Sequence, residues 1–417
     1  MDVTAGVLRA VAARPHVLLM AAPGGTAARL AAERRLRLDD LPLARTPAEA
    51  DILLVAGPDR PGLRPAVDRL WQHLPAPRAR AHAATPDAIG PALDRCRTDL
   101  TRPSRAAAGH SSDGDGTGDG TGDGTGTGDH EGHGGHGDHG DHGDHEGHGG
   151  MEMPAGLPMA GTGPDRDGLE LDQLHIALGP FLIDWPTGLT VRLTLQGDVI
   201  QRAELEEPGE QLGGGGDVPF WAESWARAAE GERIGTGQAA RRRAAAHLDS
   251  LGRLLAVAGW AGAATTARRL RDDLLDGAPG AALRPAVRRF ARRVGRSRTL
   301  YWLTCGLGPL AGSRARAAGV GGPAARADGD VPARYRTWLA DVVRDVDRLA
   351  ETAPLPADEE GPRGRPAGGE WPSAALARLL PDLLEGAELA AARLIVASLD
   401  PDPDELAAAA RGVTACD

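Results

Sequence analysis

The chain has 417 residues, which is enough for two ordinary domains with separate cores. Its net charge is −11, but residues 106–150 contain ten Asp and Glu and no Arg, so the rest carries only −1. That balance argues against a nucleic-acid partner, and we expect neither a transmembrane segment nor a signal peptide. Cys96, Cys305 and Cys416 lie far apart, which excludes a disulfide framework and favours a cytoplasmic protein.

A break in composition near Ser104 predicts a linker. Residues 109–150 hold 18 of the 58 glycines, mixed with Asp, Thr and His, and contain no Leu, Ile, Val or aromatic residue. Such a segment buries too little apolar surface to offset the entropy lost on ordering. We therefore expect an α/β domain over residues 1–104, a disordered linker over 105–168 and a second domain over 169–417.

The first domain is predicted to alternate strands and helices. The apolar runs His16–Met20 and Asp51–Gly57 predict strands, and the second is typical of a parallel strand buried on both faces. Thr26–Arg35 and Leu63–Leu74 predict helices, the latter from apolar residues at helical spacing. We therefore expect a small α/β fold with a parallel sheet.

The second domain begins with a predicted β-hairpin. Leu189–Leu195 alternates apolar with polar or small residues, and Gly197 and Asp198 turn the chain into Val199–Leu205. Helical spacing then predicts helices over Arg241–Trp260, Thr265–Asp276, Leu283–Val294, Val331–Glu351 and Ala374–Leu399. The predicted fold class is therefore α/β plus α+β, with a hairpin leading into a mainly helical domain.

The N-terminal part resembles a known family. Pro47–Gly57, followed by Arg64–Trp71 and Leu74–Pro77, is similar to the cluster-carrying small subunit of NADH-quinone oxidoreductase (respiratory complex I) and its relatives in nickel–iron hydrogenases. The resemblance covers most of residues 15–90. It implies a flavodoxin-like parallel sheet.

The C-terminal part resembles the large, quinone-site subunit of the same complex. The similar stretches, in the same order along the chain, are Gly179–Ala203, Gly306–Val320 and Glu385–Pro401. Because the two subunits are neighbours in complex I, the chain resembles a fusion of both. The implied partners are complex I- or hydrogenase-like subunits, through which the chain would reach the inner face of the membrane.

The resemblance also implies which cofactor ligands are missing. The family's small subunit holds an iron–sulfur cluster through four Cys thiolates, and an adjacent pair of them follows the first strand. This chain has Ala21 and Ala22 there, and no Cys near Arg80–Ala84, where the next ligand is expected. The quinone-binding histidines of the family's hairpin turn have no counterpart in Phe181–Thr187. We therefore expect no catalytic residue and no cofactor in the folded domains.

A histidine tract lies within the predicted linker. Its members repeat every third residue: His130, His133, His136, His139, His142, His145 and His148. Neutral imidazole binds Ni²⁺, Zn²⁺ and Cu²⁺, and the Gly, Asp and Glu spacers add flexibility and oxygen ligands. Met151, Met153 and Met159 offer thioether ligands for Cu(I). The simpler interpretation is a repeat expansion in a solvated linker, with incidental metal affinity.

Three functions therefore stay open. The first is a non-catalytic structural or accessory component of an NADH-quinone oxidoreductase-like assembly. The second is a metal-binding accessory protein that uses the histidine tract for nickel, zinc or copper. The third is an oxidoreductase subunit that works with cofactors held by a partner. The sequence leaves open whether the chain is an enzyme.

We predict that deleting His130–His148 removes most of the affinity for Ni²⁺ or Zn²⁺ and leaves the melting temperature nearly unchanged. Binding by the intact chain weakens as the pH falls through about 6.5, because each imidazole must lose its proton to bind a metal. Titration calorimetry on both chains measures this. Full affinity in the deletion would place the ligands elsewhere.

Overall fold

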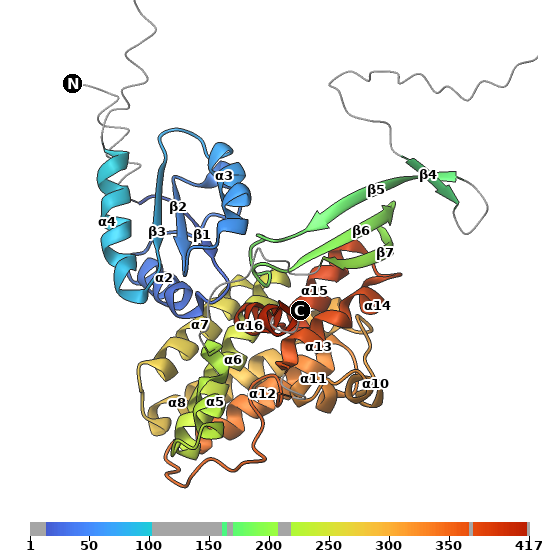
Figure 1. The fold of residues 1–417 in the computed structure, drawn as a ribbon. Coiled ribbons are helices and arrows are strands. Elements are labelled where there is room, and N and C mark those ends of the chain that lie inside the picture. Colours follow the sequence, from blue (N-terminus) through green and yellow to red (C-terminus); the bar gives the residue numbers. More distant parts are fainter. Residues whose placement is uncertain (1–13, 102–160, 165–169, 207–217, 367–369, 415–417) are drawn as a thin grey trace, which may run out of the picture. The chain divides into compact units, whose positions relative to one another are not determined.

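The structure is a computed structural model that describes residues 14–101, 161–164, 170–206, 218–366 and 370–414 (Figure 1). The histidine tract and most of the predicted linker lie outside these ranges. We call residues 14–101 the α/β lobe and residues 161–414 the C-terminal lobe. Both belong to one compact unit of the chain.

A parallel sheet forms the centre of the α/β lobe. Its strands, in spatial order, are β1 (Val17–Ala21), β2 (Ile52–Ala56) and β3 (Ala79–Ala83). A parallel bridge between Val17 and Leu43 places the segment after the first helix along the free edge of β1. The predicted parallel sheet is therefore confirmed. Strand β2 lies along one edge of β1, and the segment at Leu43 lies along the other.

Helices cover both faces of this sheet, which is why β2 is an unbroken apolar run. The helices are α2 (Thr26–Leu38), α3 (Arg64–Gln72) and α4 (Ile89–Leu100), and the short 3₁₀ turns are η1 (Pro47–Glu49), η2 (Pro61–Leu63) and η3 (Pro86–Ala88). Ile52 and Leu54 pack with α2 and α4, whereas Leu53 packs with Val67 of α3. Successive residues of β2 thus point alternately into two apolar layers, one on each face of the sheet.

The C-terminal lobe opens with an antiparallel sheet. Its strands, in order, are β4 (Gly161–Pro164), β5 (Glu170–Leu178), β6 (Thr190–Gln196) and β7 (Val199–Glu206). Gln196 pairs with Val199, and Gly197 takes a positive φ of 59° that glycine adopts without strain. This confirms the predicted hairpin. The four residues of β4 lie inside the range that composition assigns to the linker.

The rest of the described C-terminal lobe is mainly helical, as predicted. Its helices are η6 (Phe220–Ala222), α5 (Glu223–Ala229), α6 (Thr236–Val257), α7 (Ala261–Leu275), α8 (Gly280–Gly295), α9 (Arg298–Thr304), α10 (Gly312–Ala317), α11 (Gly322–Ala327), α12 (Val331–Asp347), α13 (Pro372–Arg378), α14 (Leu380–Leu384), α15 (Leu389–Leu399) and α16 (Pro403–Thr414). Helices α6, α7, α8 and α12 share one core, and a second core joins β6 and β7 to α14 and α15. None of the described helices is long and apolar enough to cross a bilayer.

The single helix predicted over Ala374–Leu399 is wrong. The structure has α13, α14 and α15 there instead. Glu385 is extended and Gly386 has a φ of 79°, so the helix stops before Leu389. The backbone N–H of Gly386 donates to Ile200 O, and the N–H of Ile200 donates to Ala387 O. Pairing with β7 thus replaces the helical hydrogen bonds that the periodicity suggested.

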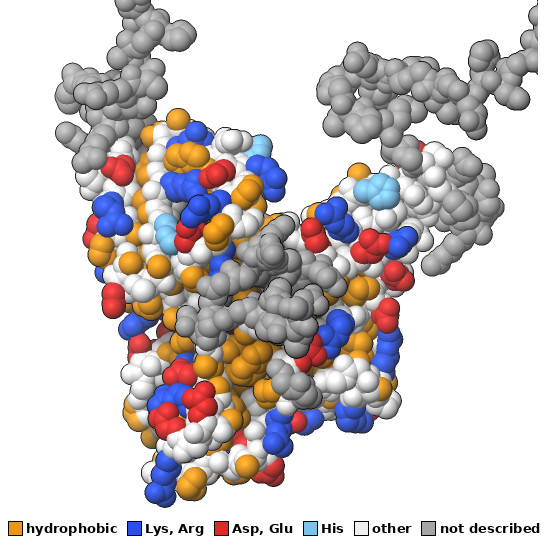
Figure 2. All heavy atoms as spheres, viewed as in Figure 1, with side chains coloured by type: hydrophobic (Ala, Val, Ile, Leu, Met, Phe, Trp, Pro, Cys, Tyr) orange, Lys and Arg blue, Asp and Glu red, His pale blue; other side chains and the backbone are white. Residues whose placement is uncertain are grey.

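The described surface mixes charges of both signs on the face seen in Figure 2, where arginines lie among aspartates and glutamates. This pattern agrees with the near-neutral charge of the sequence outside residues 106–150.

Candidate functional site

A cavity of about 330 Å³ lies between the two lobes, and we call it the interlobe cavity. The α/β lobe contributes the end of β1, part of α2 and residues 43–45. The C-terminal lobe contributes the β5–β6 turn at 182–187, the ends of α6 and α7 that face each other, and the start of α16. Ala21 and Ala22, which the sequence resemblance places where cluster ligands are expected, form part of its wall.

Part of the wall is apolar. Leu19, Leu43 and Leu182 line it together with the indoles of Trp185 and Trp221. Trp185 is buried, and its indole N–H donates to Leu189 O at 2.8 Å, which fixes the ring and the turn that carries it. The cavity therefore has a rigid apolar side.

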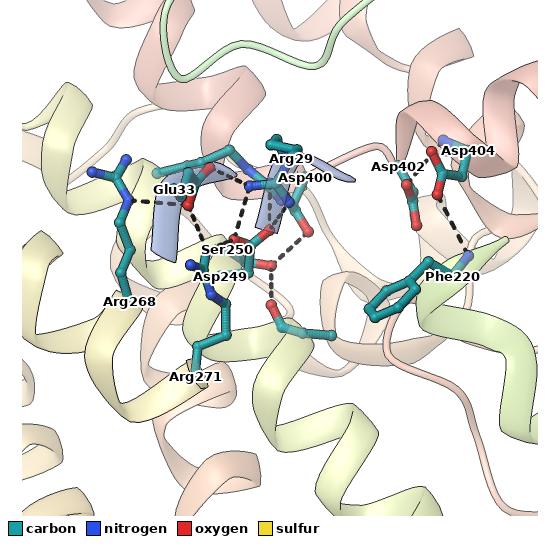
Figure 3. Close-up of polar contacts among 12 residues, drawn as sticks. Arg29, Glu33, Phe220, Asp249, Ser250, Arg268, Arg271, Asp400, Asp402 and Asp404 are labelled. Carbon is teal, nitrogen blue, oxygen red and sulfur yellow. Dashed lines mark hydrogen bonds and ion pairs between the residues drawn. The ribbon is translucent and has the colours of Figure 1, made fainter. Parts of the chain in front are cut away.

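An ion network that crosses between the lobes (Figure 3) borders the cavity through Arg29, Glu33 and Arg253. Arg29 and Glu33 lie one turn apart on α2, 2.7 Å from each other. Arg29 Nη2 lies 2.8 Å from Asp249 Oδ2 on α6. Arg271 Nη1 on α7 lies 2.8 Å from Glu33 Oε2 and 2.6 Å from Asp249 Oδ1. With Arg253, 2.6 Å from Asp249, these five residues form what we call the interlobe ion network.

The guanidinium groups keep both carboxylates of the network ionised. Burial alone would raise the pKa of Glu33, but Arg271, Arg29 and Arg268 together hold it at about 2. Burial would likewise raise the pKa of Asp249, and Arg253, Arg29 and Arg271 hold it well below its usual range. The network is thus a set of fixed charges, with Asp249 2% and Arg271 0% exposed.

A second acidic group lies where α16 begins. Asp404 Oδ1 accepts from the backbone N–H of Gly24 at 2.7 Å, which ties α16 to the loop after β1. Arg363 lies 3.2 Å from Asp402 and 2.5 Å from Asp400. Burial, together with Asp404 and Glu405, raises the pKa of Asp402 to about 8 against the opposing effect of Arg363. Burial and the neighbouring carboxylates thus favour the protonated form of Asp402 beside the cavity.

The residues around β1 do not fit an iron–sulfur cluster. Ala21 and Ala22 offer methyl groups where thiolates are needed. Cys96 is buried in α4 among core residues, and burial raises the pKa of its thiol to about 11, so it stays protonated. Cys305 is exposed just after the end of α9. Within the described ranges, no three His, Cys, Asp or Glu side chains are grouped as metal ligands.

The histidines and tyrosines of the C-terminal lobe within the described ranges do not line the cavity. His175 is on β5, 3.1 Å from Thr194. His247 is buried in α6 next to the ring of Trp338, and burial, with Arg243 and other arginines, lowers its pKa well below 6.5. Tyr335 is buried in the helical core and Tyr301 is exposed. The described lining of the cavity contains no Cys, His or Tyr.

The histidine tract, His130 to His148, lies outside the described residues, and its metal binding stays a prediction. The structure instead brings together residues that sequence analysis did not select: the interlobe ion network and Asp402. The sequence gives one signal for the network: Arg29 and Glu33, and Asp249 and Arg253, are each four residues apart in a predicted helix. Ion pairs on a solvated helix surface have the same spacing, so it does not identify a buried network.

Comparisons with known proteins give weak likenesses among solved structures and none by sequence. No family model matches the chain, and no curated protein matches its sequence. Among solved structures, a chain from the membrane-bound sulfane sulfur reductase, an archaeal respiratory membrane complex, is similar with a TM-score of 0.39 and 17% identity. The match covers 56% of this chain and 98% of that chain.

We predict that Asp249→Asn destabilises the fold by about 3 to 5 kcal/mol, because three buried guanidinium groups then lose the carboxylate they share. Urea unfolding followed by tryptophan fluorescence measures the change. The matched control is Asp39→Asn, which breaks the exposed pair with Arg35 and costs at most about 1 kcal/mol. Equal losses in the two variants would contradict the role of the network.

We also predict that Asp402→Asn flattens the dependence of stability on pH. Between about pH 4 and 8 the folded Asp402 binds a proton that the unfolded chain releases, so this group makes the native protein less stable as the pH rises. The contribution is at most about 1.4 kcal/mol per pH unit, and the neutral amide removes it. Melting temperatures from pH 5 to 9 test this against Asp382→Asn, an exposed residue paired with Arg314. An unchanged slope in Asp402→Asn would refute it.

Proposed function

We propose that this chain is a non-catalytic structural or accessory component of an NADH-quinone oxidoreductase-like assembly. One observation carries the proposal. The interlobe cavity lies between the end of β1 and the β5–β6 turn. Ala21 and Ala22 line it at the end of β1, and Leu182–Thr187 line it at the turn. These are the places where the resembled subunits have cluster cysteines and quinone-binding histidines, and here the wall has neither Cys nor His.

The ion network supports a structural role. It fixes the α/β lobe against α6 and α7 through buried charges rather than through a surface that opens and closes. In the proposed assembly the two lobes would form one rigid block, which docks complex I- or hydrogenase-like subunits and reaches the membrane through them. Such a block needs no cofactor of its own.

Two experiments in parallel test this proposal. The full chain is purified without oxygen, incubated with iron and sulfide, and assayed for iron and quinone reduction. We expect iron far below four atoms per chain and no turnover. The matched control, Cys96→Ala with Cys305→Ala, removes the thiols of the described residues and is expected to hold no less iron than the parent chain.

The second experiment isolates native complexes from cells that make the chain. We expect it to migrate with subunits that carry iron–sulfur clusters. A chain that migrates alone and, after reconstitution, carries a stoichiometric cluster or reduces quinone would overturn the proposal. A cluster-free chain that is nevertheless required for turnover by its partners would favour the oxidoreductase subunit with partner-held cofactors.

The histidine tract supports a second candidate function, a metal-binding accessory protein. Seven imidazoles at a spacing of three give many ligands for nickel, zinc or copper in one short segment. In this role the lobes would be docking modules. The test is whether the tract deletion impairs metal loading of a partner enzyme in cells while the native complex still assembles.

A further inference from the structure

The sequence from Gly277 to Ala327 is strongly basic within an acidic chain. It contains ten Arg and no Asp or Glu. Six of these arginines are exposed on α8 and at the start of α9: Arg288, Arg289, Arg292, Arg293, Arg296 and Arg298. The overall charge of −11 hides this concentration, because the ten acidic residues of 106–150 offset it.

The arginines of α8 form one continuous stripe. Leu283, Val287, Phe290 and Val294 face the helical core and are buried. Residues 288, 289, 292, 293 and 296 follow the helical period on the opposite side of the helix. The whole polar face of the last two turns is therefore guanidinium.

Most of these charges have no carboxylate partner within the described part of the chain. Arg288 lies 2.9 Å from Asp347, but no ion pair within 4.0 Å involves the other five arginines there. Arg298 instead lies over the ring of Trp302 at 5.1 Å, and Arg293 over Trp260 at 5.2 Å. By contrast, Arg29, Arg253 and Arg268, which line the interlobe cavity, are each paired with one or more carboxylates.

Helix α9, which follows α8 in the chain after two residues, carries exposed apolar side chains. Leu300 is buried in the helical core, and the hydroxyl of Ser297 caps the helix by accepting from the N–H of Leu300. The next three residues point outward: Tyr301 is 39%, Trp302 65% and Leu303 51% exposed. Three adjacent large apolar side chains on a fixed helix are unfavourable in water unless something covers them.

We propose that this basic-aromatic face, Arg289, Arg292, Arg293, Arg296 and Arg298 with Trp302 and Leu303, binds the surface of an anionic lipid bilayer directly. Unpaired guanidinium groups complement lipid phosphates, and tryptophan and tyrosine favour the headgroup region. Leu303 distinguishes a bilayer from a nucleic acid, because an aliphatic side chain gains from an apolar phase and not from stacking on bases. This contact is independent of the proposed function, since it needs no partner subunit.

The test uses the full chain and vesicles of phosphatidylglycerol and phosphatidylcholine, with chelator present so that metal on the histidine tract plays no part. We expect binding to the mixed vesicles, little binding to pure phosphatidylcholine, and loss of binding in high salt. Arg292→Glu with Arg296→Glu lowers the partition coefficient by more than about tenfold, since each arginine near such a surface contributes roughly fivefold. Trp302→Ser with Leu303→Ser weakens binding without removing its dependence on salt.

The matched control is Arg192→Glu with Arg202→Glu, which changes the charge equally at exposed positions on β6 and β7. It keeps most of the binding, and melting temperatures show that every variant is folded. Equal binding to neutral vesicles, or equal losses in the control and in the α8 variant, would overturn the proposal. So would tighter binding of a DNA duplex through the same arginines.

Discussion

Three guanidinium groups, from α2, α6 and α7, surround the carboxylate of Asp249 where almost no water reaches it. Removing such charges from water costs several kcal/mol per ion, and mutual attraction offsets that cost only when every partner is in place. Arg29 belongs to the α/β lobe, whereas Arg253 and Arg271 belong to the C-terminal lobe. Any shift between the lobes would leave buried charge unpaired, so their relative position is fixed by this contact.

The interlobe cavity follows from that constraint. Helix α2 reaches the C-terminal lobe with Arg29 and Glu33, and its Leu30 packs in the helical core beside them. These contacts hold the end of β1 near the β5–β6 turn. The backbone N–H of Gly24 also donates to Asp404 at the start of α16, which adds a second link between the lobes. The cavity is therefore bounded by ionic contacts and two indoles, and burial raises the pKa of Asp402 in its lining.

Local patterns in the sequence predict most of the fold. The strand at Ile52–Ala56 and the hairpin around Gly197 form as predicted. A strand buried on both faces is an unbroken apolar run, and a strand buried on one face alternates apolar with polar residues, so both can be recognised in the sequence. Residues 374–399 differ, since their apolar spacing suits one helix but backbone pairing with Ile200 breaks it at Gly386. That pairing joins segments far apart in the sequence, which local periodicity does not record.

The candidate site is harder to predict for the same reason. Arg29 and Glu33, or Asp249 and Arg253, have the spacing of solvated surface pairs, and only the packing of three helices makes them a buried network. The resemblance located Ala21 and Ala22, which do line the cavity, but it gave no sign of Asp402 or of the charges across from them. The protonation of Asp402 and the charge pairing of the network depend on side chains from distant parts of the sequence.

The most direct test of this account asks whether the lobes hold together without a covalent link. A protease site inserted within residues 105–160 allows the chain to be cut once, and size-exclusion chromatography then follows the two fragments. We predict that they elute together at the size of the intact chain, and that Asp249→Asn makes them separate. Fragments of the unsubstituted chain that elute apart after cleavage would contradict the central claim that the interlobe ion network makes the two lobes one body.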